Sequence, residues 1–447
     1  MRSERPLESR TGGRAATTGV IPGDIAISVG NPESPLPTGW KWRPLTDVAR
    51  LETGHTPSRR HPEYWGGAVP WIGIRDATGN HGRTIYQTTQ YTNELGIRNS
   101  SARILPANTV CLSRTASVGY VVVMGVPMAT SQDFVNWVCG PDLDYRYLKY
   151  VLLGERSSFL RFASGTTHQT IYFPEVKAFH VAMPPRDIQR DIADILGMLD
   201  DRIDLLRQTN TTLESIAQAL FKSWFIDFDP VRAKQAGREP EGMDAATAAL
   251  FPAEFEESAL GLIPKRWKVG VVEDLLVLQR GFDLPASQRI EGSFPVLAAS
   301  GPSGCHHEAM VKGPGVTTGR SGVIGNVYFV HEDFWPLNTS LWVKQFKVAT
   351  PEFAYQFLRT LDLKRLNAGS AVPTLNRNHV HAQTAVLPPS QVVMAYSELA
   401  AVLLRRTRAN VMEVEPITAV RDTLLPRLIF GKLRLPEPAQ QLDEAFA

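Results

Sequence analysis

The amino-acid sequence predicts an α+β protein built from two similar domains, each followed by a long helix. The chain has 447 residues, which is more than one domain usually contains. A plan of short strand-like segments followed by a long amphipathic stretch occurs twice along the chain. The two amphipathic stretches carry narrow apolar seams at helical spacing. These observations together indicate a duplicated unit.

The duplication is visible in three pairs of segments. The stretch SGTTHQTIYFPEVKAFHVAMPP is matched by AGSAVPTLNRNHVHAQTAVLPP at an offset of 204, so that Thr170 corresponds to Thr374. An earlier pair matches Gly54 with Gly281 at an offset of 227, and a third pair has an offset of 206. The paired segments are 164–185 and 368–389, 39–54 and 266–281, and 112–123 and 318–329. Because the offset changes only in the early part of the unit, we expect a variable part followed by a fixed part.

The pattern divides the chain into seven segments. Residues 1–35 contain Arg, Ser and Glu without an apolar run, so we expect a disordered leader. The other expected segments are a first α+β domain over 36–185, a long helix over 186–226, an acidic linker over 227–260, a second α+β domain over 261–389, a second long helix over 390–433 and a tail over 434–447. Within the domains, runs such as YVVVMGV and SLWVKQF, bounded by Gly, Pro and Asn, are typical of strands and turns.

The two fixed parts are expected to form long helices that pack against each other as an antiparallel coiled coil. Apolar residues recur at spacings of three, four and seven, which predicts a narrow stripe that must be buried against another helix. The seam residues expected in the first helix are Ile192, Ile195, Leu199, Ile203, Leu206, Leu213 and Leu220. Those expected in the second are Leu399, Leu403, Val414, Ile417 and Leu424. The second helix contains Pro416, so we expect it to kink or break near 414–416, whereas the first should be continuous.

Charge and cysteine content narrow the function classes. Residues 36–185 carry 15 Lys/Arg against 10 Asp/Glu, residues 261–389 carry 13 against 9, and residues 225–260 carry 3 against 8. Two basic domains joined by an acidic segment could both face a polyanion. Three cysteines form no disulfide framework and suit the cytoplasm, and no apolar run is long enough to span a membrane. The sequence Cys305-His306-His307 is interpreted as a loop and not as a metal site, since adjacent residues rarely supply three ligands.

No catalytic apparatus is recognisable in the sequence. The two Pro-Pro sites lack the Asn or Asp before them and the aromatic residue after them that an adenine methyltransferase motif needs. A nuclease motif could be assembled from Asp142, Glu175 and Lys177, but the second copy has His379 and His381 in the corresponding place. The segment GVTTGRSG lacks the spacing and the Lys of a phosphate-binding loop. We therefore expect no catalytic residue, no metal and no cofactor in this chain.

Several segments resemble one protein family. The stretch MLDDRIDLLRQTNTTLESIAQALFKSWFIDFDPVRAK (198–234) closely resembles the central conserved region of specificity subunits of type I restriction-modification enzymes. The segment LLPRLIFGKL (424–433) resembles their C-terminal conserved region, and GWKWRPLTDVARLETGHTPS and GTTHQTI are also similar to that family. The resemblance covers nearly everything after residue 35.

The resemblance implies two target recognition domains that each read one half of a split, asymmetric site in double-stranded DNA. It also implies that the helices set the spacing between the half-sites and hold two modification subunits. Those subunits would carry S-adenosylmethionine and methylate adenine, and separate motor-nuclease subunits would use ATP and Mg²⁺. This chain would then be non-catalytic. Two alternatives stay open, namely a fused or stand-alone restriction or methyltransferase enzyme, and a coiled-coil adaptor that does not bind DNA.

Base reading in a DNA groove requires Arg, Lys, Asn or Gln side chains. Side chains of these types beside expected turns are the candidates for contacting DNA, although any of them could equally be a solvated residue or a phosphate contact. The candidates are Arg75, Arg114 and Gln132 in the first domain, and Arg320, Asn326 and Asn338 in the second.

Overall fold

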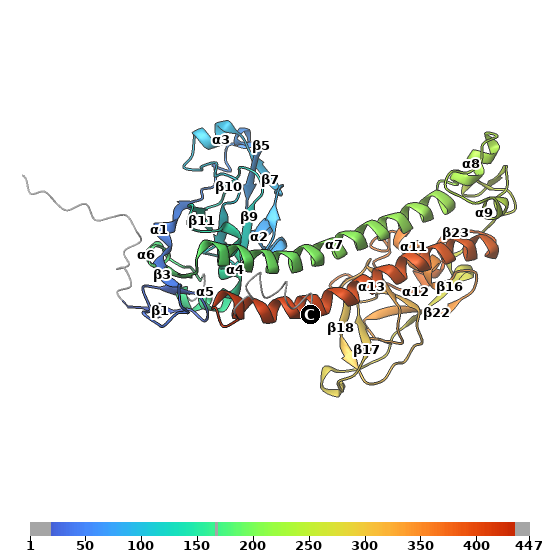
Figure 1. Ribbon diagram of the computed structural model, residues 1–447. Helices are drawn as coiled ribbons and strands as arrows, with labels where there is room; N and C mark the ends of the chain where they lie inside the picture. The colour runs from blue at the N-terminus through green and yellow to red at the C-terminus, as the bar shows by residue number, and fades with distance from the viewer. Residues whose placement is uncertain (1–18, 166–168, 434–447) are drawn as a thin grey trace, which may run out of the picture. The chain divides into compact units, whose positions relative to one another are not determined.

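The computed structural model describes residues 19–165 and 169–433 and divides into two compact units. Unit 1 is the chain up to Ile203 together with the part from Glu415 onward, and unit 2 is Asp204–Val414. Two long helices, α7 (Arg186–Phe225) and α13 (Ser390–Ile429), each begin in one unit and end in the other (Figure 1). The tail expected over 434–447 and the first eighteen residues of the expected leader lie outside the described residues.

Unit 1 contains three sheets, with strand orders β4-β11-β8-β9-β6, β1-β2-β12-β3 and β10-β5-β7. Its strands are β1 (Ile21–Pro22), β2 (Ile27–Val29), β3 (Lys41–Pro44), β4 (Ala49–Thr53), β5 (Trp65–Ile72), β6 (Thr84–Ile85), β7 (Gln90–Thr92), β8 (Val110–Ser113), β9 (Val121–Met124), β10 (Ala129–Thr130), β11 (Phe134–Cys139) and β12 (Phe179–Met183). Its short helices are α1 (Leu45–Val48), η1 (Pro62–Tyr64), α2 (Ile74–Gly79), α3 (Glu94–Arg98), α4 (Tyr145–Gly154), α5 (Arg156–Phe162) and α6 (Phe173–Lys177). The apolar strands β8 and β9 are buried along their whole length, with α4 packed on them.

Unit 2 contains four sheets, with strand orders β16-β22-β19-β20, β18-β17-β21, β15-β23 and β13-β14. Its strands are β13 (Phe255–Ser258), β14 (Gly261–Pro264), β15 (Lys268–Val271), β16 (Leu276–Arg280), β17 (Phe294–Ala298), β18 (Gly301–His306), β19 (Gly315–Gly319), β20 (Val327–Val330), β21 (Trp335–Pro336), β22 (Ser340–Phe346) and β23 (Thr384–Leu387). Its short helices are α8 (Asp229–Gln235), α9 (Ala245–Ala249), α10 (Val272–Leu275), η2 (Ala286–Gln288), α11 (Pro351–Thr360) and α12 (Arg377–His381).

The two units repeat one topology, which confirms the predicted α+β duplication. The antiparallel order β4-β11-β8-β9 corresponds to β16-β22-β19-β20, and the antiparallel pair β3 and β12 corresponds to β15 and β23. The short parallel pair β5 with β10 in unit 1 corresponds to β17 with β21 in unit 2, and unit 1 has a further parallel pair, β6 with β9. Each unit buries its own apolar core. The first part of α7 contributes residues such as Leu196 to the core of unit 1, and the first part of α13 contributes residues such as Tyr396 to the core of unit 2.

The expectation of a disordered leader over 1–35 is wrong for the part that the structure describes. Strand β2 pairs with β12, and β1 pairs with β2, so the segment extends a sheet of unit 1. The carboxylate of Glu155 accepts hydrogen bonds of 2.5 to 3.0 Å from the backbone N–H groups of residues 24–27. Ala26, Ile27 and Val29 are buried in the core. These few apolar residues were too short a run to be recognised among the polar residues around them.

The segment expected as an acidic linker is also structured. Residues 227–260 form α8, α9 and β13, and the side chains of Phe228, Val231 and Phe251 are buried in the core of unit 2. The acidic residues lie on the outside of this segment while its aromatic residues pack inward, so net charge alone was a poor guide to its structure.

The helices α7 and α13 run antiparallel and pack together within each unit (Figure 1). In unit 1, Arg421 Nη1 donates to Asp200 Oδ1 at 2.9 Å. In unit 2, Asn410 Nδ2 donates to Asn210 Oδ1 at 2.7 Å. The position along α7 therefore increases while the position along its partner decreases, which is the antiparallel arrangement that the apolar seams predict.

Helix α7 is continuous, as predicted, and α13 is unbroken near Pro416, where a kink or break was predicted. Helix α13 continues through both Pro416 and Pro426. A proline removes one backbone hydrogen bond and costs roughly 3 kcal/mol. Most helical stability in proteins comes from packing of an apolar face, and Asn410 on one side of Pro416 and Leu428 on the other are both fully buried. Among the described residues, no helix is long and apolar enough to cross a membrane.

Candidate nucleic-acid interface

A loop follows the first strand of the main sheet in each unit, and a glycine begins it. A side chain at Gly54 would overlap the backbone oxygen of Ser131, and a side chain at Gly281 would overlap the backbone oxygen of Leu337. Backbone hydrogen bonds hold the two loops at corresponding places, from His55 N to Thr130 O at 2.9 Å and from Phe282 N to Pro336 O at 2.8 Å. The repeated glycines are therefore explained by close backbone approach. We call loops 54–61 and 281–288 the reading loops.

Two of the predicted DNA-contacting residues lie against the reading loops at corresponding positions. Gln132 is exposed, and its Oε1 accepts a hydrogen bond of 2.5 Å from Thr56 Oγ1. Asn338 is half-buried, and its side-chain amide donates to Asp283. Gln132 and Asn338 are separated by the offset of 206, and Thr56 and Asp283 by the offset of 227. The same backbone place thus carries a different polar pair in each unit.

The arginines of the third repeated segment serve a different purpose. The backbone oxygen of Arg114 accepts from Ile171 N at 2.8 Å, and that of Arg320 accepts from Leu375 N at 2.7 Å. The repeated stretches near Thr170 and Thr374 are thereby attached to the turns after β8 and β19. The same attachment is therefore made in both copies of the repeated motif.

The side chains of these two arginines are engaged inside their domains. The guanidinium of Arg114 lies 4.7 Å above the ring of Phe173, and burial lowers its pKa against the raising effect of Asp133. Arg320 Nη1 donates to the backbone oxygen of Asn338 at 2.7 Å. The remaining candidates, Arg75 on α2 and Asn326 in the turn between β19 and β20, are exposed, and Asn326 Nδ2 lies 3.2 Å from Tyr328 Oη. The structure thus brings Gln132 and Asn338 to the reading loops and leaves Arg75 and Asn326 elsewhere on the surface.

Sequence reasoning missed a group of residues on the reading loop of unit 1. The exposed guanidinium of Arg59 lies 3.8 Å from the centre of the Trp65 ring and 5.1 Å from that of Trp71. Arg59 Nη2 also donates to Gln90 Oε1 at 2.7 Å. The available sequence signal was the basic and aromatic run SRRHPEYW, but this run shows no periodicity and therefore predicts no particular structure or site.

The residues expected in the helix seam differ in how far they are buried. Ile192, Ile203 and Leu206 are buried, whereas Leu399 is 47% exposed. Ala400, the next residue, takes the buried position instead at 1% exposure. The other expected seam residues are half-buried, namely Ile195, Leu199, Leu213, Leu220, Leu403, Val414, Ile417 and Leu424.

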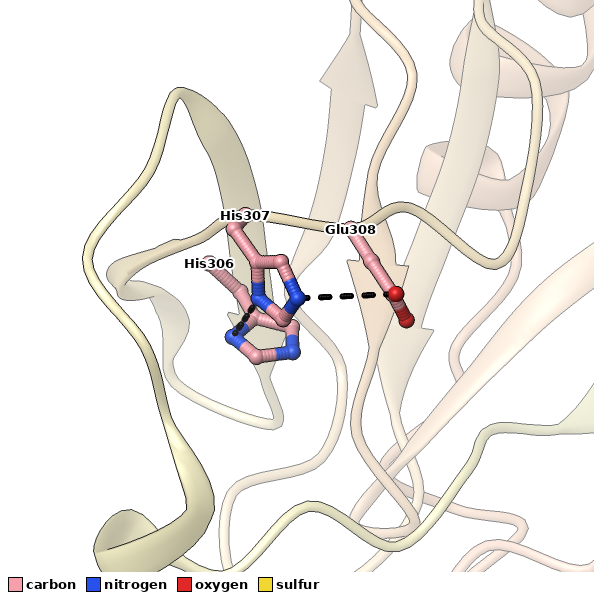
Figure 2. Close-up of side chains that lie close together, drawn as sticks. All are labelled: His306, His307 and Glu308. Carbon is pink, nitrogen blue, oxygen red and sulfur yellow. Dashed lines mark hydrogen bonds and ion pairs between the residues drawn. The ribbon is translucent and has the colours of Figure 1, made fainter.

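The histidine pair noted in the sequence lies beside a glutamate, and His306, His307 and Glu308 each offer one ligand atom within 4.8 Å of the others. Figure 2 shows the imidazole of His307 lying against that of His306, with Glu308 on its other side. The Nδ1 atoms of the two histidines are 3.4 Å apart, but Glu308 approaches Nε2 of His307 at 3.5 Å. His306 Nδ1 is also within 3.1 Å of the backbone N of Ile290. Metal ligands converge on one ion at about 2 Å, and these three side chains could hold one, so the interpretation of this stretch as a loop without a metal stays a prediction.

Comparison with known proteins places these features in a family context. Residues 37–215 match the family model described as type I restriction modification DNA specificity domain. The chain is 25% identical over 437 residues to the type I restriction enzyme MjaIX specificity subunit of Methanocaldococcus jannaschii, covering 90% of this chain and 95% of that protein. It is 28% identical over 336 residues to the HindI specificity subunit of Haemophilus influenzae, covering 60% of this chain and 72% of that one. A crystal structure of a type I restriction-modification S subunit from M. genitalium has a TM-score of 0.57 at 17% identity, covering 89% of this chain and 97% of that chain, which is a likeness of fold.

Proposed function

This chain belongs to the specificity subunits of type I restriction-modification systems, and we propose that its two units each read one half of a bipartite, asymmetric site in double-stranded DNA. As a specificity subunit it is the non-catalytic, DNA-specifying subunit of such a system. The observation that carries the proposal is the corresponding pair at each reading loop, Thr56 with Gln132 and Asp283 with Asn338. A shared backbone with different polar side chains is what two readers of different half-sites require.

Base readout by these pairs follows from their chemistry. Gln and Asn form bidentate hydrogen bonds with adenine in the major groove, and a good pair of this kind discriminates by about 1–3 kcal/mol. The net charges of +5 over residues 36–185 and +4 over residues 261–389 favour approach to the phosphate backbone. Gln132 and Asn338 are therefore the leading candidates for base contacts, with Arg75 and Asn326 as further candidates.

We expect the two reading loops to act independently. In the assembled enzyme, Gln132→Ala should relax one position of the first half-site and leave the second unchanged, and Asn338→Ala should do the reverse. Mapping of methylated adenines in a genome that carries each variant measures this. Gln87→Ala, which removes another exposed glutamine of unit 1, is the matched control. A variant that changes both half-sites together would contradict the modular reading.

The two long helices are proposed to set the spacing between the half-sites. Each has 40 residues, which corresponds to about 60 Å at 1.5 Å per residue. Reading centres one DNA turn apart are separated by about 34–36 Å, and a helix pair of this length can hold such a separation. The antiparallel seam supports this proposal because it stiffens both helices.

The same helices are proposed to hold two modification subunits. Large apolar side chains that do not face the seam are exposed on both helices, at 44 to 64% of their surface. They are Met198, Leu205 and Ile216 on α7, and Met394, Val402 and Met412 on α13. These side chains are the contacts that we propose for the modification subunits, because contact with a partner would remove their apolar surface from water. Native mass measurement of the reconstituted complex should give two modification subunits for each chain, and a 1:1 species at saturating partner would contradict the proposal.

Catalysis is proposed to reside in the partner subunits. The modification subunits would bind S-adenosylmethionine, and motor-nuclease subunits would use ATP and Mg²⁺. Because DNA restriction acts on intracellular DNA, the proposed location is the cytoplasm, where Cys111, Cys139 and Cys305 would stay reduced.

A further inference from the structure

The reading loop of unit 1 presents an arginine whose position is fixed from two sides. The guanidinium of Arg59 is stacked 3.8 Å above Trp65, and its Nη2 atom donates to Gln90 Oε1 at 2.7 Å. An arginine held flat by an aromatic ring and a side-chain amide loses less conformational freedom when it binds a ligand. Its other N–H donors remain available at the surface, since Arg59 is exposed.

The platform under Arg59 is itself attached to the loop. Trp71 Nε1 donates to the backbone oxygen of His55 at 3.1 Å, and Trp65 Nε1 donates to that of Ser58 at 3.4 Å. The two indole rings meet edge to face with centroids 5.2 Å apart. Loop and platform are therefore held together, and Arg59 has a defined position on them.

A cavity opens next to this arginine. It has a volume of about 360 Å³ and is lined by Arg59, Trp65, Gly66, Gly67, Gln90 and Tyr91 among others. Gly66 has a φ of +80°, and nothing lies within 4 Å of the place where its side chain would be. The two glycines thus leave the surface open for close approach of a ligand to the backbone.

Unit 2 has no counterpart of this arrangement. At the offset of 227 that relates the two reading loops, the position of Arg59 is occupied by Ala286. The pairing of β5 with β10 and of β17 with β21 places Val296 where unit 1 has Trp71. The cation above a tryptophan ring therefore belongs to one reading loop only, whereas the loop of unit 2 packs Phe282 against Trp335 and Trp342.

We propose that Arg59 is a specificity-determining residue that reads a guanine of the first half-site through its major-groove edge. The inference rests on the proposed function, because it assumes that unit 1 reads DNA. Bidentate contact of Arg with guanine O6 and N7 is the commonest specific contact between proteins and DNA. It requires a planar donor group in a defined orientation, which the Trp65 ring and the Gln90 amide provide here. A phosphate contact would need no such fixation.

The test uses the complete enzyme with Arg59→Ala, Arg59→Lys and the control Arg60→Ala, which removes the neighbouring exposed arginine. Methylated adenines are mapped, and binding is measured on oligonucleotides with single base-pair changes. Arg59→Ala should lower discrimination at one G·C pair of the first half-site by roughly tenfold or more. Arg59→Lys should restore the charge and not the discrimination. The second half-site should stay intact in every variant, which verifies folding.

Three outcomes would overturn the proposal. One is a first half-site without any G·C pair. A second is that Arg59→Ala weakens DNA binding equally on all sequences and lowers the salt dependence of binding by the amount expected for about one phosphate contact. Arg59 would then contact the DNA backbone and not a base. A third is unchanged specificity in Arg59→Ala. Failure of the proposed function would look different, because the wild-type complex would then show no dependence on the first half-site at all.

Discussion

Glu155 is the residue on which the ordered part of the N-terminal segment most depends. Its carboxylate is fully buried and accepts the backbone N–H groups of residues 24–27 and the hydroxyl of Ser158. We predict that Glu155→Ala destabilises unit 1 and detaches strands β1 and β2 from their sheet. Glu155→Gln should have a smaller effect in the same direction, because an amide keeps one oxygen acceptor and loses the negative charge.

The magnitude follows from the donors left without a partner. Ala26 and Ile27 are both at most 1% exposed, so water cannot replace the lost acceptor at their N–H groups. Each unpaired buried donor costs about 1–3 kcal/mol, which gives about 2–6 kcal/mol for Glu155→Ala. Glu155→Gln should cost about 1–2 kcal/mol, the difference between charged and neutral acceptors. Since whole domains are stable by roughly 5–15 kcal/mol, the loss in Glu155→Ala is large.

The measurement is hydrogen exchange of the amides of residues 24–27 in the full chain, together with chemical denaturation. Faster exchange confined to these amides and to β1, β2 and the neighbouring β12 is expected at the lowest denaturant concentrations. Glu94→Ala is the matched control, because Glu94 is an exposed residue of unit 1 whose ion pair with Arg98 is on the surface. Wild-type exchange at residues 24–27 in Glu155→Ala would refute the reasoning.

Two further predictions concern the reading loops and pH. Gly54→Ala should displace the first reading loop and impair recognition of the first half-site alone, and Gly281→Ala should impair the second alone; mapped methylation decides, and an effect on both would contradict it. His381 Nε2 accepts from Leu278 N at 2.8 Å in the core of unit 2, and burial lowers the pKa of this imidazole. As the pH falls through roughly 6.5, His381 is therefore protonated in the unfolded chain before it is protonated in the folded chain. The free energy of unfolding should decrease below that pH, and it should decrease less steeply in His381→Gln. An equal slope in thermal unfolding of both proteins from pH 7.5 to 5 would contradict this role.

The sequence predicted the features that follow from a repeated chain pattern. The duplicated α+β plan and the two long antiparallel helices rest on periodic apolar positions such as Ile203 and Leu206, and burial of an apolar stripe requires that arrangement whatever the details. Leu399 shows the limit of this argument. A seam read from sequence alone can be displaced by one residue, because Ala400 fits a closer helix contact than a leucine does.

Features that depend on single long-range contacts were not predictable. The order of residues 19–35 results from the bonds of Glu155 to a segment some 130 residues earlier, and no local pattern contains that information. The same holds for Arg59, whose significance comes from Trp65 and Gln90 meeting it in space. Arg114 shows the reverse case. It was a predicted DNA contact because of its residue type, but its side chain packs on Phe173 inside its own domain.

The repeat itself separates framework from recognition. Positions at which the two copies agree, such as Gly54 with Gly281 and Thr170 with Thr374, are engaged in close backbone approach or backbone hydrogen bonds. Some positions that occupy the same place and differ in chemistry lie on the reading loops or against them. Thr56 and Asp283 differ in this way, as do Gln132 and Asn338, and Arg59 and Ala286. A duplicated reader that must recognise two different sequences has to keep its backbone and change its side chains at such positions. Divergence between matched positions, and not residue type alone, is therefore the sequence signal by which we propose to identify the recognition surface of this chain.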